Sequence, residues 1–236
     1  ENGKITRLVK NIESPSYTEI INAEGGILIP GLIDCHWHLW TSLLRSMAGD
    51  SAEEGYFKMT ARYSRLYSPE DMKLAATYAI AEAVHSGITC ISDYNHNARS
   101  PQFVQASFDA MAAMGIRGHI SYGTYRDLPD SQPTDFKGIN ELKQFIDSNS
   151  KYKGISLGLG SRSVNYNNLE KDWKHARDLG LRITIHASSN ESQKGQITSL
   201  FKKGLLAEDV NIIHGNAITP DEIKMLEDTG TSLTMT

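Results

Sequence analysis

Short apolar segments alternate with helix-like segments along most of the chain, and this alternation limits the possible folds more than any other feature. Seven strands are expected, at 32–37, 88–94, 116–122, 154–159, 181–187, 210–214 and 232–235. After a long first connection they recur every ~20 to 40 residues, which is the spacing of right-handed βαβ units with parallel strands. The sequence therefore predicts an α/β protein built on a parallel sheet.

The helical segments carry start and stop signals. Ser68 at the N-cap and Pro69 at the first helical position predict a helix that Gly87 ends. Further helices are expected at 101–114, 136–147, 169–179, 193–203 and 221–226. Residues 39–67 show only weak helical spacing, so we expect an irregular insertion with some helix there.

Two architectures share this alternation, the doubly wound sheet and the (β/α)8 barrel. No glycine-rich phosphate-binding motif follows any predicted strand, whereas polar residues and histidines end several of them. Because the active site of a (β/α)8 barrel is built from the C-terminal ends of its strands, we predict a TIM-like barrel over 31–236. Strand eight is missing, and an open parallel barrel would expose two long edges, so we expect an incomplete barrel.

The first 30 residues are expected to be organised differently. They predict short strands at 5–9, 18–21 and 26–29, which cannot bury a core alone. We therefore expect residues 1–30 to be one part of a small N-terminal β-sandwich domain that needs partners from elsewhere in the sequence.

The charge balance and the cysteines limit the function classes. With 24 Lys and Arg against 28 Asp and Glu, the net charge is −4 and no basic block favours nucleic acid, so a small neutral substrate fits better. Cys35 and Cys90 lie inside predicted strands and are expected to be buried thiols of a reduced compartment. No apolar run approaches the ~20 residues that cross a bilayer, and no signal peptide is recognisable, so we expect a cytoplasmic protein.

Four histidines end predicted strands. His36 and His38 lie one residue apart, so they face the same side of their strand and form half of a metal site. His186 and His214 end two later strands and would converge on the same mouth of a barrel. A single histidine of this kind is more often a hydrogen-bonded core residue, but four at one end of three strands favour a cluster for metal binding and catalysis.

Several motifs resemble the amidohydrolase superfamily, in the branch that holds cytosine, guanine and adenosylhomocysteine deaminases and the triazine hydrolases. The resemblance covers nearly the whole chain, and its most specific signal is the His-X-His after Pro-Gly-Leu-Ile-Asp. The motifs are Pro-Gly-Leu-Ile-Asp-Cys-His-Trp-His-Leu at 30–39, Leu-Arg at 44–45, Ile-Thr-Ile-His at 183–186, Ile-Ile-His-Gly-Asn at 212–216 and Thr-Pro-Asp-Glu at 219–222.

The resemblance implies a distorted barrel that binds one divalent ion, Zn2+ or alternatively Fe2+, through His36, His38 and His186. An aspartate at the end of strand eight would be a further ligand and proton shuttle, and His214 would be a catalytic residue that touches the water or the substrate. A bound divalent ion lowers the pKa of water from 15.7 to about 7, which supplies a nucleophile at neutral pH. Relatives with two metals use a lysine at the end of strand four, but residues 157–162 contain none, so we expect one metal.

Two features depart from the pattern of this branch. Its deaminases place a glutamate three residues beyond the histidine of strand five, where this chain has Ser189 and the nearest acid is Glu191. The chain also stops at Thr236, before the aspartate of strand eight, so we expect the isolated chain to be inactive. Without a glutamate at the position of Ser189, the usual route of deamination is in doubt.

Further residues are candidates for substrate binding because they follow predicted strands. They are His96, Trp40, Arg162 and Ser189. Three of them have a structural alternative: His96 bonded to local backbone, Trp40 packed in a core, and Arg162, like Arg45, in a surface ion pair.

The leading hypothesis is a metal-dependent hydrolase of carbon–nitrogen bonds other than peptide bonds, in which metal-activated water attacks an sp2 carbon of a cyclic amidine or nucleobase-like substrate and deaminates it. Two alternatives stay open: hydrolysis of a ring amide or of a C–Cl or C–S bond in the same site, and a non-catalytic barrel. The expected partner is a small heterocyclic substrate, without nucleic acid or membrane, and we expect a homo-oligomer.

Overall fold

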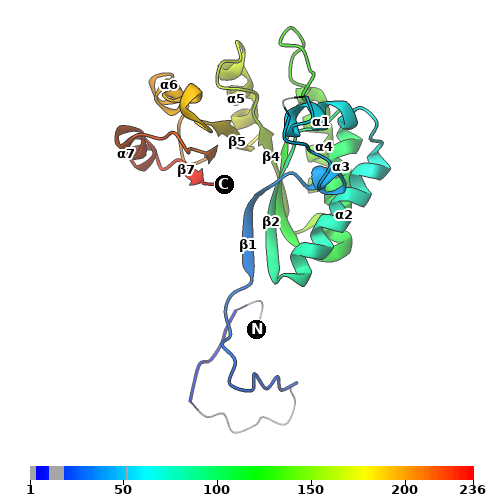
Figure 1. Ribbon diagram of the computed structural model, residues 1–236. Helices are drawn as coiled ribbons and strands as arrows, with labels where there is room; N and C mark the ends of the chain where they lie inside the picture. The colour runs from blue at the N-terminus through cyan, green and yellow to red at the C-terminus, as the bar shows by residue number, and fades with distance from the viewer. Residues whose placement is uncertain (1–3, 11–18, 52) are drawn as a thin grey trace. The chain divides into compact units, whose positions relative to one another are not determined.

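The computed structural model describes residues 4–10, 19–51 and 53–236, and the chain divides into two units, 1–30 and 31–236. In the second unit, seven parallel strands follow one another in sequence order and curve into a nearly closed barrel (Figure 1). They are β1 (Leu32–Trp37), β2 (Ile88–Asn95), β3 (Arg117–Tyr122), β4 (Ile155–Gly160), β5 (Arg182–Ala187), β6 (Val210–His214) and β7 (Ser232–Thr234). This confirms the α/β class and the partial TIM barrel, with β1 and β7 as edge strands.

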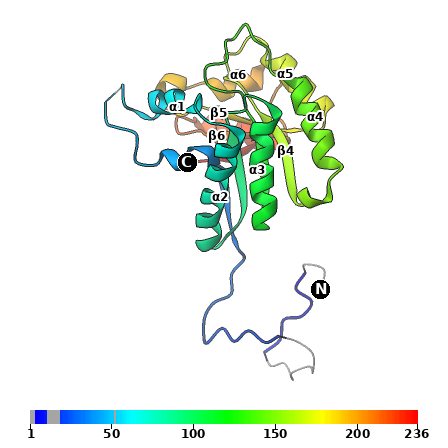
Figure 2. The ribbon, with the colours of Figure 1, turned by 90° about the vertical axis from the view of Figure 1, so that its right-hand side faces the viewer.

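Helices α2 to α7 alternate with the strands and cover their outside, as the sequence pattern predicts, and α1 precedes α2 in the long first connection. The helices are α1 (Tyr56–Ser64), α2 (Pro69–His85), α3 (Pro101–Met114), α4 (Phe136–Asp147), α5 (Leu169–Asp178), α6 (Gln196–Lys202) and α7 (Pro220–Thr229), with short 3-10 turns at 39–44, 150–152 and 191–193. Figure 2 shows α2, α3 and α4 side by side on one flank. One large core joins the sheet to these helices, for example through Ile183 of β5, Ile80 of α2 and Phe108 of α3.

Local side-chain chemistry explains where the helices begin and end. At the start of α2, the Ser68 hydroxyl accepts a hydrogen bond from the Asp71 amide at 3.2 Å, and the Asp71 carboxylate accepts one from the Ser68 amide at 2.8 Å. This reciprocal pair satisfies two amides that the helix itself leaves free. Gly115 ends α3 with a φ of 67°, in the left-handed region that glycine adopts without a steric penalty.

The same capping arrangement at α7 involves a fully buried carboxylate. Glu222 accepts hydrogen bonds from the Thr219 amide at 3.1 Å and from the Thr198 amide at 2.9 Å, so it ties α7 to α6. Burial alone raises the pKa of Glu222, but these backbone bonds and those from the two hydroxyls outweigh it and lower the pKa below the ordinary value. The ionised form is therefore the one that stabilises the fold.

This carboxylate predicts an acid-dependent loss of stability. A group with a depressed folded-state pKa stabilises the protein fully above its unfolded pKa, near 4.5, and loses that contribution as the pH falls through the folded value. We expect Glu222→Gln to cost about 1–3 kcal/mol at pH 7, because an amide nitrogen cannot accept the Thr219 bonds, and to cost less at pH 3. Urea unfolding at both pH values measures this. The exposed Glu227→Gln is the control, and an equal cost of Glu222→Gln at both pH values would contradict the assignment.

Two sequence expectations are corrected by the structure: the strands expected before Pro30, and the burial of Cys35 and Cys90. No strand forms in residues 4–10 or 19–30, and Thr18 of the predicted strand 18–21 lies outside the described residues. Isolated short strands lack neighbours for their backbone bonds, and Ile5 and Leu8 are accordingly almost fully exposed. Cys35 is exposed, because it lies on the edge strand β1, which pairs with β2 on one side only. Cys90 is half-buried.

Among the described residues, no helix is long and apolar enough to cross a membrane.

Candidate metal centre

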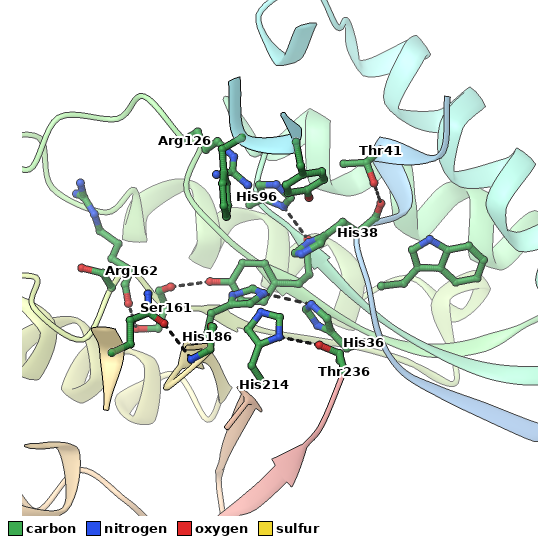
Figure 3. Close-up of a pocket in the computed structure, with 17 residues that line it drawn as sticks. His36, His38, Thr41, His96, Arg126, Ser161, Arg162, His186, His214 and Thr236 are labelled. Carbon is green, nitrogen blue, oxygen red and sulfur yellow. Dashed lines mark hydrogen bonds between the residues drawn. The ribbon is translucent and has the colours of Figure 1, made fainter. Parts of the chain in front are cut away.

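Three of the predicted histidines meet at one end of the barrel. His36 and His38 lie at the end of β1 and His186 at the end of β5, and one ligand nitrogen from each falls within 4.8 Å of the others. The Nε2 atoms of His36 and His186 are 3.2 Å apart, and the rings of His36 and His38 are 4.7 Å apart between centroids (Figure 3). Strand alternation places both β1 histidines on the inner face, as expected.

Their electrostatics favour metal binding. Burial lowers the pKa of His36 to about 3, helped by the neighbouring charges of His38 and His214, and burial lowers the pKa of His38 to about 4. The pKa of His186 is lowered for the same reasons. All three rings are therefore neutral at pH 7 and offer lone pairs, which is the state that binds a metal ion.

Hydrogen bonds around the three rings orient them. The Nδ1 of His38 bonds the Tyr94 carbonyl oxygen at 2.7 Å, which leaves Nε2 for a ligand. Tyr94 in turn donates its hydroxyl to the Ser161 carbonyl at 2.6 Å, and its ring lies 4.3 Å from that of His186. The buried Nδ1 of His36 has no partner among the described residues. Three neutral imidazoles with converging nitrogens fit a zinc ion, whose catalytic sites use three protein ligands and an open fourth position.

The fourth predicted histidine lies beside this group. The ring centroid of His214 is 5.2 Å from that of His186 and 6.1 Å from that of His36. Its φ of 81° lies in the left-handed region, a strain of about 1–3 kcal/mol that is common at functional sites. Its Nδ1 is 2.7 Å from the Thr236 hydroxyl, which orients the ring. His214 is thus close to the three histidines without belonging to the group that could share one ion.

A cavity of about 790 Å3 opens over the histidines, and it includes three of the four candidates for substrate binding. His96, Arg162 and Ser189 line it. The Arg162 guanidinium is largely engaged already, because it donates to the carbonyls of Leu128 and Gln132 and pairs with Asp130 at 2.9 Å. Its main contact is therefore the loop that follows β3.

The fourth candidate, Trp40, lies behind the cavity wall. It is 1% exposed and packs with Leu44, Met59 and Met72 in a separate core. Its indole nitrogen is 3.4 Å from Nδ1 of His96, so Trp40 supports a cavity residue and does not line the cavity itself. Trp40 lies in the 3-10 turn at 39–44, beyond the end of β1, so strand alternation does not set the direction of its side chain. Arg45 pairs with Glu82 at 2.6 Å on the surface.

Sequence reasoning missed several lining residues, among them Tyr56 and Phe57 of α1, Tyr94 of β2 and Arg126. Arg126 lies in the loop after β3, and its position behind the C-terminal end of a barrel strand is the signal that could have found it. No sequence signal placed α1 over the cavity, since its helical pattern is weak.

Comparison with known proteins agrees with the fold and the histidine pattern. The chain is 27% identical over 246 residues to a 5-methylthioadenosine/S-adenosylhomocysteine deaminase of Thermococcus onnurineus, covering 96% of this chain and 55% of that protein. It is 26% identical over 244 residues to a 5'-deoxyadenosine deaminase of Methanothrix thermoacetophila, covering 96% and 54%. The chain thus spans about half the length of the curated relatives it matches.

Solved structures resemble this one in fold. An adenosine deaminase of Xanthomonas campestris with bound zinc matches with a TM-score of 0.69 at 20% identity, covering 87% of this chain and 49% of that one. Atrazine chlorohydrolase of Arthrobacter aurescens, complexed with zinc, matches with a TM-score of 0.66 at 21% identity, covering 87% and 53%. The sequence profile of one family matches residues 27–236, nearly nine-tenths of the chain, and the protein therefore belongs to the amidohydrolase family.

Proposed function

We propose that this chain supplies the metal-binding part of a hydrolase that deaminates a small heterocycle of the cyclic amidine or nucleobase type. The observation that carries the proposal is the convergence of His36, His38 and His186 at the C-terminal ends of barrel strands, inside a cavity. The similarity to deaminases of adenine nucleosides supports the reaction class and the kind of substrate.

The metal in this proposal is one divalent ion, Zn2+ or alternatively Fe2+, held by His36, His38 and His186. Imidazole suits both ions, and zinc is the ion named in the similar structures. When bound, such a cation supplies the Lewis acidity that makes water nucleophilic at neutral pH. Residues 155–162 at the end of β4 contain no lysine that could bridge a second ion, so we propose a single metal.

His214 is proposed to move the proton of the attacking water. The Nδ1 of His214 lies 2.7 Å from the Thr236 hydroxyl, and the side chain lines the cavity. When Nδ1 carries the proton of this hydrogen bond, Nε2 is left as an acceptor. Burial lowers the pKa of His214, so the ring is neutral and able to accept a proton at pH 7.

His96 is proposed to position the substrate. It is 9% exposed, and its Nε2 is buried without a hydrogen-bond partner among the described residues. If Nδ1 accepts the Trp40 indole proton, Nε2 carries a hydrogen that a ring nitrogen or carbonyl of a bound heterocycle can accept. Such a buried donor without a partner is costly unless a ligand satisfies it.

A second candidate function is hydrolysis of a ring amide or of a C–Cl or C–S bond. Ser189 lines the cavity where deaminases of this branch place a glutamate, and none of the described residues that line the cavity is acidic. A leaving group that needs no protonation of a ring nitrogen suits such a site better. Atrazine chlorohydrolase is among the proteins with a similar fold.

The test combines metal analysis with product analysis. Purified protein is assayed for metal by inductively coupled plasma mass spectrometry and for ammonia release from aminated pyrimidines, triazines and adenine nucleosides. We expect one transition metal per chain. Ammonia release that chelation abolishes and Zn2+ restores would support the proposed deamination, and it would contradict the expectation that the isolated chain is inactive. Products formed without ammonia from chloro- or thioether-heterocycles or ring amides would favour the second candidate, and a protein without transition metal would favour a non-catalytic barrel.

Four predictions from the sequence accompany this proposal. We propose that residues 31–236 are the hydrolase barrel and that residues 1–30 belong to a small β domain. A cytoplasmic location and a homo-oligomeric state likewise stay predictions.

A further inference from the structure

Arg126 is a cation at the cavity that pairs with no carboxylate among the described residues. It lies in the loop between β3 and α4 and lines the cavity that holds the histidines (Figure 3). The next residue, Asp127, pairs with Arg65 at 2.8 Å and with Arg99 at 3.2 Å. The guanidinium carbon of Arg126 lies 4.6 Å from the ring centroid of Phe57 and 5.4 Å from that of Tyr56.

The cavity around Arg126 carries positive charge without compensation. Its described lining contains two arginines and no aspartate or glutamate, and Arg162 is already paired with Asp130. A divalent ion at the histidines would make the cavity more positive still.

The aromatic contacts keep Arg126 oriented. The Arg126 guanidinium lies over the rings of Phe57 and Tyr56 and also forms a side-chain hydrogen bond with Tyr56. These two residues hold its orientation, and its remaining N–H groups can donate to a ligand. A planar carboxylate is the group that a guanidinium edge binds best, through two parallel hydrogen bonds.

We propose that Arg126 binds an anionic substituent, a carboxylate, of the substrate, so that the substrate class is a small heterocycle or cyclic amide that carries a carboxylate. This inference rests on the proposed function, because it assigns the reacting carbon to the three histidines and the carboxylate to Arg126. The net charge of the chain predicts a small neutral substrate, whereas Arg126 in the cavity favours an anionic one instead. A net charge of −4 for the whole chain does not determine the sign of the charge inside one cavity.

The experiment compares carboxylated pyrimidines and triazines with their uncharged counterparts, in the zinc-loaded protein and its variants. Pyrimidine-4-carboxylate and its carboxamide serve as binding probes in calorimetric titrations, and aminated pairs serve as substrates. We expect Arg126→Gln to weaken binding and kcat/KM for the carboxylates by about 10- to 30-fold, mainly through KM, and to leave the uncharged compounds within about 2-fold. Arg126→Lys is expected to retain part of the preference.

Arg117→Gln is the matched control, because Arg117 is an exposed arginine at the opposite end of β3. Circular dichroism checks that both variants fold. Equal losses for charged and uncharged compounds in Arg126→Gln, or no preference for any carboxylate in the parent protein, would overturn the inference. Binding of carboxylates through Arg126 without turnover of any compound would support the inference and reject the proposed reaction.

Discussion

Replacing His186 by alanine is expected to abolish binding of the proposed metal and any hydrolysis that the parent protein shows. His186 is the one member of the three-histidine group that comes from β5, and its Nε2 lies 3.2 Å from that of His36. Without it, the two histidines of β1 form an incomplete site. Loss of a partner that merely orients a ligand costs about 10- to 100-fold in metal affinity, so loss of a ligand is expected to cost more than about 100-fold.

Metal content and affinity measure this effect directly, by mass spectrometry and by competition with a zinc-binding dye. His85→Ala is the control, because His85 lies exposed in the last turn of α2. Circular dichroism shows whether His186→Ala folds, and activity is measured beside metal content. A folded His186→Ala protein that binds zinc as tightly as the parent would remove the basis of the metal centre and of the hydrolase proposal.

Replacing Trp173 by alanine is expected to destabilise the fold by about 3–5 kcal/mol, the usual cost of emptying a core site of this size. Trp173 of α5 is fully buried, and its indole donates to the Ser161 hydroxyl at 2.8 Å. Ser161 follows β4 and lines the cavity, so the same side chain holds a helix against the barrel and one wall of the site in place. The midpoint and slope of urea unfolding give the change in free energy.

Two further variants separate the contributions at this position. Trp173→Phe keeps most of the apolar volume but removes the bond to Ser161, so we expect a cost of about 1–2 kcal/mol. Leu74→Ala on the exposed face of α2 is the control and is expected to stay within about 0.5 kcal/mol of the parent. If Trp173→Ala were no more costly than Leu74→Ala, α5 would not be anchored as described.

The parts of the fold that could be predicted depend on local signals. The predicted bounds 32–37, 136–147 and 210–214 agree with β1, α4 and β6, because buried strands and capped helices are encoded by neighbouring residues. The helix expected at 193–203 is shorter, and α6 begins at Gln196. Gly195 precedes it with a φ of 84°, a left-handed conformation that a continuous helix cannot include.

Some residues of the candidate site could likewise be predicted from local sequence signals, and others could not. Strand alternation and the barrel rule together predict that His36, His38, His186 and His214 lie near one another, because each lies at the end of a strand. The same reasoning misplaced Trp40, whose direction depends on a 3-10 turn, and it missed Arg126, which reaches the cavity from a loop. Loop and turn conformations depend on long-range contacts such as those between Arg162 and the carbonyls of Leu128 and Gln132.

The amino-acid pattern alone was sufficient for the parallel α/β barrel, for its order of strands and for the histidines at its C-terminal rim, because periodicity, caps and strand ends are properties of adjacent residues. The sign of the charge in the cavity, the place of Arg126 and the burial of Trp40 arose from folding. These features depend on contacts between residues that are distant in the sequence, and local sequence patterns do not predict such contacts.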